Sequence, residues 1–399
     1  MNKGLNLDKT YQYLLITLAF LMPLTVSGAN FIIVIICFTW LLSGDYKSKF
    51  NHIIQSNLLK SSIIFYLIHV VGMIWTEDLF WGFHILHKMW YFLLLFPILF
   101  TIVKKEYIQF YISSFLLAIL LTEVTSYLIW FELIPPMKHA SVYNPTPFMN
   151  HVTYNPMLAF AVYLVGHEIL FNSNLAKLKK IIYSFFMTTM SINMFITGGR
   201  AGQIMYFVVI SILILQFFNT QRLKAIIAIL IVIPTIFFTA YNSSKIFQDR
   251  VDIAYGNIVN YENSKTTSTG QRITYAINFV ELFKESPILG VGTGDFPFEM
   301  EKIYLKNSPE VPRGANPHNM YILILSQLGL LGLFSFLLIF YFQIKLSYNS
   351  NEKYIRDIGF VLPLLFLVIM MSDSYLLGHF TSLLYIFFSS FLYKDFEKS

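Results

Sequence analysis

Apolar runs long enough to cross a bilayer recur along almost the whole chain, and they constrain its fold more than any other feature. A helix needs roughly 20 apolar residues to cross the hydrocarbon core. Hydrophobic residues make up 56% of the chain and charged residues only 13%, which is about half the charged share of an ordinary soluble domain. The composition therefore excludes a soluble enzyme, and the pattern predicts an all-α polytopic membrane protein.

We expect about 12 transmembrane helices, and their positions divide the chain into three parts. Residues 1–240 hold nine predicted spans, residues 241–317 form one large outer loop with short helices, and residues 318–399 hold the last three spans. The spans are predicted near residues 11–28, 30–44, 60–76, 88–103, 108–130, 153–171, 181–197, 202–218, 224–240, 318–345, 357–372 and 374–393.

The basic residues orient these spans. An N-terminus on the inner side places 17 of the 28 Lys and Arg residues inside and 11 outside, and eight of the outer ones belong to the loop 241–317. The short outer connections then hold only Lys88, Lys138 and Arg200. Because basic residues in short loops decide orientation, we expect both termini in the cytoplasm and the large loop outside.

A histidine stands at the entry to the tenth predicted span, in the sequence Asn316-Pro317-His318-Asn319. Asn316 suits an N-cap and Pro317 the first helical turn, so His318 is predicted at the positive end of the helix dipole, where its ring stays neutral and able to accept a proton. On a continuous helix, Gly329 and Gly332 fall within about 40° of the His318 face and leave a shallow groove. The alternative is a capping histidine with glycines that serve helix packing.

A glycine-rich connection surrounds Arg200, in the sequence Thr197-Gly198-Gly199-Arg200-Ala201-Gly202. Three glycines let backbone N–H groups converge as in anion-binding nests. A guanidinium binds phosphate oxygens in a bidentate way and keeps its charge. The alternative is an interfacial arginine that reaches lipid headgroups.

A second arginine, Arg272, lies in a predicted helix over Gln271–Glu285. One stripe of that helix is polar and consists of Thr274, Asn278, Glu281 and Glu285. Arg272 lies about 160° from Thr274 on the helical wheel, with the apolar face. We expect it to point toward the membrane-embedded body and to need an anionic partner, which a ligand phosphate supplies. The alternative is a structural ion pair with Asp373, Asp295 or Glu299.

Weaker signals surround these three motifs. Asp373 and His379 flank the last outer turn and are interpreted as supporting residues, and Gly290–Asp295 as a flexible turn that shapes the site. The sequence has no Walker motif, no Asp-x-Asp motif and no cytoplasmic loop large enough for a nucleotide site. We therefore predict a site at the outer face without metal, cofactor or nucleotide.

These residues together resemble the O-antigen ligase and O-antigen polymerase superfamily of Gram-negative bacteria. His318-Asn319, nine residues, Gly329, two residues and Gly332 are similar to the signature of the ligases. Residues 197–202 resemble the family's arginine motif, with Ile204 in place of the usual leucine, and residues 269–296 resemble its large outer loop. The resemblance implies a fold of the GT-C type.

The resemblance also implies an activity. The protein would transfer O-antigen polysaccharide from undecaprenyl diphosphate to lipid A–core oligosaccharide at the periplasmic face of the inner membrane, as a step of lipopolysaccharide biosynthesis, with inversion at the anomeric carbon. It implies His318 as general base and Arg200 and Arg272 as the groups that bind diphosphate. The implied substrate-binding residues are Asn319, Gly199, Gly329 and Gly332. Membrane lipids are the other expected partners, and nucleic acid is not one.

Two other functions stay open at this point. One is an O-antigen polymerase of the same superfamily, which joins two lipid-linked units. The other is a transporter of a lipid-linked glycan, with the arginines as phosphate-binding gates. A transporter needs cationic groups along a path through the membrane, whereas these candidate residues cluster at one face, which favours transfer.

Overall fold

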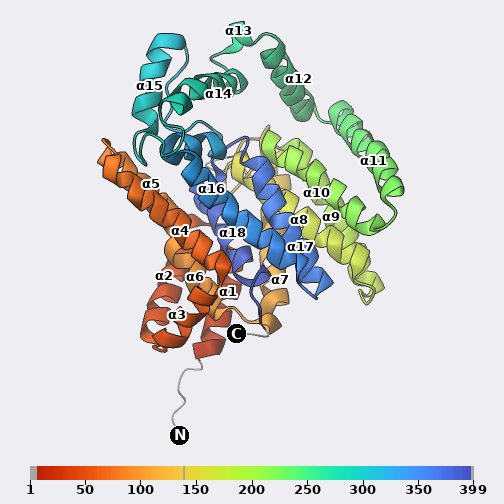
Figure 1. Ribbon diagram of the computed structural model, residues 1–399. Helices are drawn as coiled ribbons and strands as arrows, with labels where there is room; N and C mark the ends of the chain where they lie inside the picture. Colours follow the sequence, from red (N-terminus) through yellow and green to blue (C-terminus); the bar gives the residue numbers. More distant parts are fainter. Residues whose placement is uncertain (1–6, 138–139, 397–399) are drawn as a thin grey trace. The chain divides into compact units, whose positions relative to one another are not determined.

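The computed structural model describes residues 7–137 and 140–396, and these residues form helices joined by turns and loops without a β-strand (Figure 1). Lys138, which enters the charge count above, lies outside the described residues. The chain divides into two compact units. The first unit contains the described parts of residues 1–12, 33–105 and 253–399, and the second contains residues 13–32 and 106–252.

The first unit is a helical bundle around α16, which packs against α4, α14 and α17, while α18 packs against α6. Aromatic side chains fill its centre: the rings of Phe65 and Phe336 lie 5.2 Å apart and those of Phe340 and Tyr385 lie 5.7 Å apart. Its helices are α3 (Tyr46–Gln55), α4 (Asn57–Gly72), α5 (Leu79–Trp90), α6 (Phe96–Ile102), α13 (Tyr261–Ser264), α14 (Ser268–Glu285), α15 (Phe296–Asn307), α16 (Met320–Tyr348), α17 (Lys353–Ile369) and α18 (His379–Leu392).

The second unit is built around α8, which is buried along its length from Tyr154 to His167. Helices α7, α9 and α10 pack against α8, and α11 packs against α10. The bounds are α7 (Ile108–Trp130), α8 (His151–Phe171), α9 (Lys177–Ile196), α10 (Arg200–Phe218) and α11 (Arg222–Ser243). Three helices cross the boundaries of the units, namely α1 (Leu7–Leu21), α2 (Val26–Leu42) and α12 (Lys245–Val259).

Each of the twelve predicted spans overlaps a helix, so the all-helical architecture is confirmed. Among the described residues, six helical segments are long and apolar enough to cross a membrane, or seven if the bent pair α2 and α3 counts as one. The six are Asn57–Trp75, Leu79–Ile102, Lys105–Trp130, Arg200–Phe218, Arg222–Ser243 and Met320–Tyr348. The total of twelve spans and their orientation stay predictions.

Helix α16 departs from the predicted continuous helix, because it is broken at Gly329. This residue has φ 58° and ψ −155°, a backbone conformation that essentially only glycine adopts. Beyond the break the helix no longer follows 100° per residue from its start, so the predicted alignment of Gly329 and Gly332 with the His318 face is wrong.

The segment Pro287–Gly292 fills the break in α16. The N–H groups of Leu330 and Leu331 donate to the carbonyls of Pro287 and Ile288 at 2.9 and 3.2 Å. In return, the N–H groups of residues 291 and 292 donate to the carbonyls of residues 326 and 327 at 2.8 and 3.0 Å. The backbone groups that the break exposes are therefore paired, as a membrane interior requires.

This loop also closes the groove that the glycines were expected to leave open. A Cβ on Gly329 would lie 2.4 Å from the carbonyl of Ile288, whereas a Cβ on Gly332 would lie 2.3 Å from the Cβ of Leu328 in the same helix. Both glycines are buried. The prediction of an open groove is wrong, because the chain's own loop occupies it at Gly329 and side chains of the preceding turn of α16 fill it at Gly332. The packing alternative describes these contacts. A substrate-binding role for Gly329 and Gly332 stays a prediction.

Candidate functional site

His318 lies just before α16 and not in its first turn, which corrects the predicted cap. The N-cap is Asn319, whose Oδ1 accepts from the N–H groups of Tyr321 and Ile322 at 2.9 and 3.2 Å. His318 has φ 52°, a left-handed conformation that costs a non-glycine residue about 1 kcal/mol. Its N–H donates to Asn316 Oδ1 at 2.9 Å, so Asn316 holds the histidine backbone instead of capping the helix.

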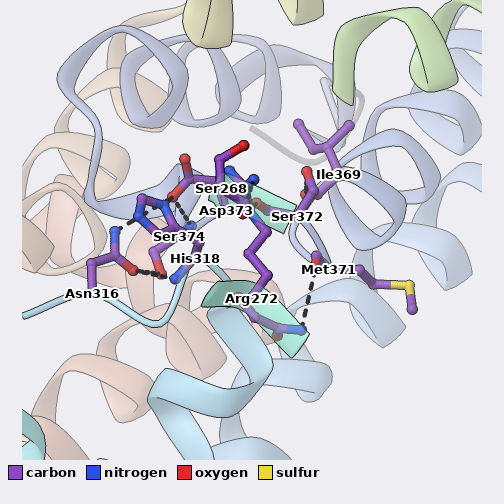
Figure 2. Close-up of polar contacts among 10 residues, drawn as sticks. Ser268, Arg272, Asn316, His318, Ile369, Met371, Ser372, Asp373 and Ser374 are labelled. Atoms are coloured by element: carbon purple, nitrogen blue, oxygen red, sulfur yellow. Dashed lines mark hydrogen bonds and ion pairs between the residues drawn. The ribbon is translucent and has the colours of Figure 1, made fainter. Parts of the chain in front are cut away.

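The His318 ring is paired with Asp373, as Figure 2 shows. The distance from His318 Nδ1 to Asp373 Oδ1 is 3.2 Å. The same carboxylate oxygen accepts the N–H of Ser374 at 2.7 Å and an amide N–H of Asn316 at 3.4 Å. The Asp373 side chain is 19% exposed and that of His318 is 41% exposed, so the carboxylate is the inner member of the pair and the imidazole the outer one.

The pairing decides which ring nitrogen of His318 can take a proton. A carboxylate beside Nδ1 holds the hydrogen on that nitrogen, and a neutral ring then carries its lone pair on Nε2. Burial alone raises the pKa of Asp373, but the hydrogen bond and charge of His318, the N–H of Ser374 and the charge of Arg272 outweigh it and lower that pKa below its usual range. Asp373 is therefore ionised and can stabilise an imidazolium.

Arg272 reaches the same turn from α14 (Figure 2). Its Nε donates to the carbonyl of Ser372 at 3.2 Å and its Nη1 to that of Ser268 at 3.0 Å. Within the described part of the chain, no carboxylate lies in ion-pair contact with this guanidinium, because Asp373 pairs with His318. Asp295 accepts the N–H groups of residues 77 and 78, and Glu299 pairs with Lys302. Arg272 therefore does not form the structural ion pair that was the predicted alternative.

The predicted faces of α14 are wrong. Thr274 and Asn278 belong to the buried side of the helix, whereas Ile277 and Val280 are exposed. The two polar residues point inward because they have partners there: the hydroxyl groups of Thr274 and Tyr261 lie 2.9 Å apart, and Asn278 donates to Ser308. Arg272 contacts the turn by its position near the start of α14 and not through an apolar stripe.

The turn between α17 and α18 is thus the centre of this site. Asn319 Nδ2 donates to the carbonyl of Met371 at 3.2 Å, and the N–H of Met320 to that of Met370 at 2.9 Å. His379 Nδ1 lies 2.5 Å from the hydroxyl of Tyr91, and its supporting role stays a prediction. The structure therefore brings His318, Asn319 and Arg272 to one turn, together with Asp373.

Arg200 and Gly199 lie in the second unit, at the start of α10. Gly199 is the N-cap and Arg200 the first helical residue. None of the neighbouring glycines has a positive φ, so the backbone does not form the predicted nest. The glycines instead allow close packing: a Cβ on Gly202 would lie 2.2 Å from the Cβ of Asn155, and one on Gly199 would lie 2.6 Å from Asn155 Cγ.

A histidine and a further arginine accompany Arg200. The Arg250 guanidinium of α12 lies against Gly198, where a Cβ would be 3.1 Å from Nη2. Burial lowers the pKa of His151, and the charges of Arg250 and Arg200 lower it further. Asp249 pairs with Lys245 and Asp252 accepts from Tyr241, so no carboxylate of the described residues pairs with Arg250.

The tautomer of His151 follows from Asn144. The Oδ1 of Asn144 accepts the N–H of Gly198 at 2.9 Å, so its Nδ2 faces His151 Nδ1 at 2.8 Å and donates to it. A neutral ring that accepts at Nδ1 carries its hydrogen on Nε2. This second cluster therefore offers two guanidinium groups and one N–H donor, a set suited to an anion.

Sequence reasoning missed His151 and Arg250 because neither belongs to a glycine-rich or spaced motif. Two signals are usable: Arg250 is one of three arginines in the 241–317 segment, and the N-cap Asn150 precedes His151. His318 and Arg272 belong to the first unit and Arg200 to the second. Their convergence in one site stays a prediction.

The comparisons with known proteins agree with the sequence motifs. Residues 185–337 match the family model described as O-antigen ligase, and this stretch contains Arg200, Arg272 and His318. The chain is also 30% identical to an uncharacterised protein of Haemophilus influenzae over 178 residues, which is 42% of this chain and 44% of that relative. The match spans less than half of either protein.

The apolar helices and the family match together indicate an integral membrane protein. Over residues 185–337 the chain is similar to the O-antigen ligase family.

Proposed function

We propose that this protein is a membrane glycosyltransferase that acts as an O-antigen ligase. It moves O-antigen polysaccharide from undecaprenyl diphosphate to lipid A–core oligosaccharide at the periplasmic face of the inner membrane. The observation that carries the proposal is the pairing of His318 with Asp373 on the turn that also holds Arg272. A base with a carboxylate partner and a neighbouring fixed cation are the two groups that such a transfer requires.

In the proposed reaction, His318 Nε2 takes the proton of an acceptor hydroxyl while that oxygen attacks the anomeric carbon of the donor sugar. The bond between the anomeric carbon and the phosphate oxygen breaks, and undecaprenyl diphosphate leaves with the electron pair. A single displacement of this kind inverts the anomeric carbon. Asp373 is a positioning residue here, because it holds the imidazole in one tautomer and stabilises the imidazolium that forms.

The arginines supply the charge that the leaving diphosphate needs. A guanidinium aimed at developing negative charge stabilises a transition state without a metal ion. We assign Arg272 and Arg200 to this task, with Arg250 beside Arg200. The support is chemical: Arg272 and Arg250 lack a carboxylate partner in the described parts of the chain, and such groups favour an anionic ligand.

Reconstitution tests the proposal. Purified protein in liposomes is given undecaprenyl-diphosphate-linked glycan and lipid A–core, without nucleotide and with a chelator, and both lipids are followed by mass spectrometry. We expect glycan on lipid A–core from the wild type and none from His318→Ala. The matched control is His87→Ala, since His87 is an exposed histidine of α5 in the same unit.

The other outcomes separate the alternatives. Longer donor chains with unmodified lipid A–core would mean a polymerase, and transfer that needs a divalent cation would remove the charge role of the arginines. Wild-type protein that keeps its fold but forms no covalent product would overturn the transferase assignment in favour of transport.

A further inference from the structure

A cavity lies at the end of the first unit that is predicted to face the cytoplasm, whereas the His318 site is predicted on the outer side. Its volume is about 260 Å³, and its walls come from α3, α16 and the ends of α4, α6 and α18. The residues that give it character are His52, Asn57, Phe100, Lys345, Asn349 and Lys394. One acidic residue, Asp395, also lines it. Two lysines and a histidine against one carboxylate give the cavity a positive balance.

Lys394 is the half-buried cation of this cavity. Its Nζ donates to the carbonyls of Val103 and Thr101 at 3.0 and 3.4 Å and lies 5.9 Å from the centre of the Phe100 ring. Burial, with a smaller effect of the nearby Lys104, lowers the pKa of Lys394 to about 8. Carbonyl oxygens satisfy its hydrogen bonds but carry no full charge, so an anion in the cavity would stabilise the ammonium form.

Helix α3 places this cavity at a membrane surface. The chain bends by 114° between α2 and α3, so α3 runs across the direction of the helix before it. Its exposed apolar residues Tyr46, Phe50 and Ile54 follow a spacing of four and form one stripe, while His52 and Gln55 face the cavity from the other side. An amphipathic helix of this kind lies in the interface with its apolar stripe among acyl chains.

The ends that meet at the cavity are those that the basic residues assign to the cytoplasm. They are the start of α4 and the ends of α6, α16 and α18. Lys60, Lys104 and Lys345 stand at these ends. The inner leaflet is rich in anionic lipid, and basic pockets between helices on that side bind phosphate-bearing headgroups.

We propose that this cavity binds the headgroup of an anionic phospholipid from the cytoplasmic leaflet, with Lys345 and Lys394 on its phosphate. The asparagine amides of the wall donate to the remaining phosphate oxygens, and Phe100 faces the glycerol end. A soluble phosphate shares this chemistry, but the apolar stripe of α3 beside the cavity favours a ligand that is anchored in the bilayer.

The test uses full-length protein in detergent, stripped of lipid and then mixed with phosphatidylglycerol or with phosphatidylcholine. Native mass spectrometry measures the bound lipid. We expect the wild type to retain phosphatidylglycerol in preference to phosphatidylcholine. Each lysine near the phosphate contributes about fivefold to affinity, so the double variant Lys345→Gln/Lys394→Gln should bind about 25-fold more weakly.

The matched control removes the same charge elsewhere. Lys179 and Lys180 are exposed, are both predicted on the cytoplasmic side and do not line the cavity, so Lys179→Gln/Lys180→Gln should retain the wild-type affinity. If the double variant of the cavity misfolds, the exposed Lys345 changed alone to Gln should still lose about fivefold.

Three results would overturn the proposal. They are equal loss in the cavity and control variants, no preference for phosphatidylglycerol, or displacement of the lipid by millimolar glycerol phosphate, which would identify a soluble ligand. A photoactivatable phosphatidylglycerol provides a second readout without any variant. Its cross-links should map to residues 52–57, 342–349 and 393–395, and cross-links confined to other segments would contradict the assignment. None of these results depends on glycan transfer.

Discussion

Two of the histidines that stand at the starts of helices, His318 before α16 and His151 in α8, have opposite surroundings. His318 has a carboxylate at Nδ1 and a half-exposed ring. His151 has an amide at Nδ1, and burial together with the charges of two nearby arginines lowers its pKa. A carboxylate prepares an imidazole to take a proton, whereas two guanidinium groups keep it neutral.

The comparison teaches that position at a helix start does not define the role of a histidine. The group at Nδ1 decides which nitrogen is free: Nε2 accepts in His318 and donates in His151. One ring therefore suits the removal of a proton from a sugar hydroxyl, and the other suits a hydrogen bond to an anion. The following predictions can break or sharpen this distinction.

Removal of His318 should have the largest effect. A general base contributes typically 10²–10⁴-fold, so His318→Ala should reduce transfer by about 10³-fold, or about 4 kcal/mol in the barrier. His151→Ala should reduce it less than about tenfold, because a single neutral hydrogen bond is lost. Initial rates in the reconstituted assay measure both, and equal losses would break the comparison.

The second prediction concerns the break at Gly329 in α16, the helix that follows His318. Gly329→Ala places a Cβ 2.4 Å from the Ile288 carbonyl at φ 58°, and a conformation open essentially only to glycine costs about 1–3 kcal/mol before the clash is counted. Gly44→Ala is the control, since Gly44 has φ 66° with nothing within 4 Å. Thermal melting in detergent should fall much further for Gly329→Ala, and similar melting temperatures would exclude the clash as the cause.

The third prediction tests whether the His318 site needs a guanidinium at position 272 or only a positive charge. Lysine keeps the charge but loses the planar guanidinium that donates to Ser372 and Ser268 together. Transfer should fall by about 10²-fold, the loss typical of one misplaced charge-stabilising donor. Arg313→Lys, an exposed arginine paired with Glu301, should keep wild-type activity. Full activity of Arg272→Lys would show that the mechanism needs a positive charge at position 272 but not a planar guanidinium.

The acid sensitivity of the second unit should show the smallest effect. Because the folded state lowers the pKa of His151, the unfolded chain binds that proton more readily as the pH falls below about 6.5. Stability from this group is present above that pH and is lost below it. His151→Gln and Arg250→Gln should therefore flatten the fall of melting temperature between about pH 7 and about pH 5. Lys245→Gln is the control, and an unchanged slope in all variants would contradict the assigned cause.

The sequence predicts the helices, whereas the set of site residues stays a prediction. His318 follows from its local motif and Arg272 from a helical face that the structure does not have, yet both reach the turn at Asp373, which the sequence also indicates. The predicted N-cap of α16 is wrong because Asn316 and Asn319 are the same residue type, and both suit an N-cap equally well. The chain uses the second one, since Asn316 is engaged with the backbone of His318 and the hydroxyl of Ser374.

Other features depend on partners that are distant in the chain. The break at Gly329 exists because residues 287–292 supply its hydrogen bonds, and nothing in residues 320–348 alone indicates that segment. The inward orientation of the Thr274 side chain likewise depends on its contact with the hydroxyl of Tyr261. Helical periodicity assigns polar residues to solvent and has no access to such partners.

The break in α16 has a consequence for how the protein is made. Residues 287–292 are synthesised before Met320–Tyr348, so the segment of backbone that completes this helix already exists when the helix leaves the ribosome. Until the two meet, the helix has unpaired N–H and C=O groups in its middle, and these resist release into lipid. Membrane insertion of α16 and folding of the preceding loop are therefore one event, and a change in the loop at Pro287 or Ile288 should show as failed insertion of a helix whose own sequence is intact.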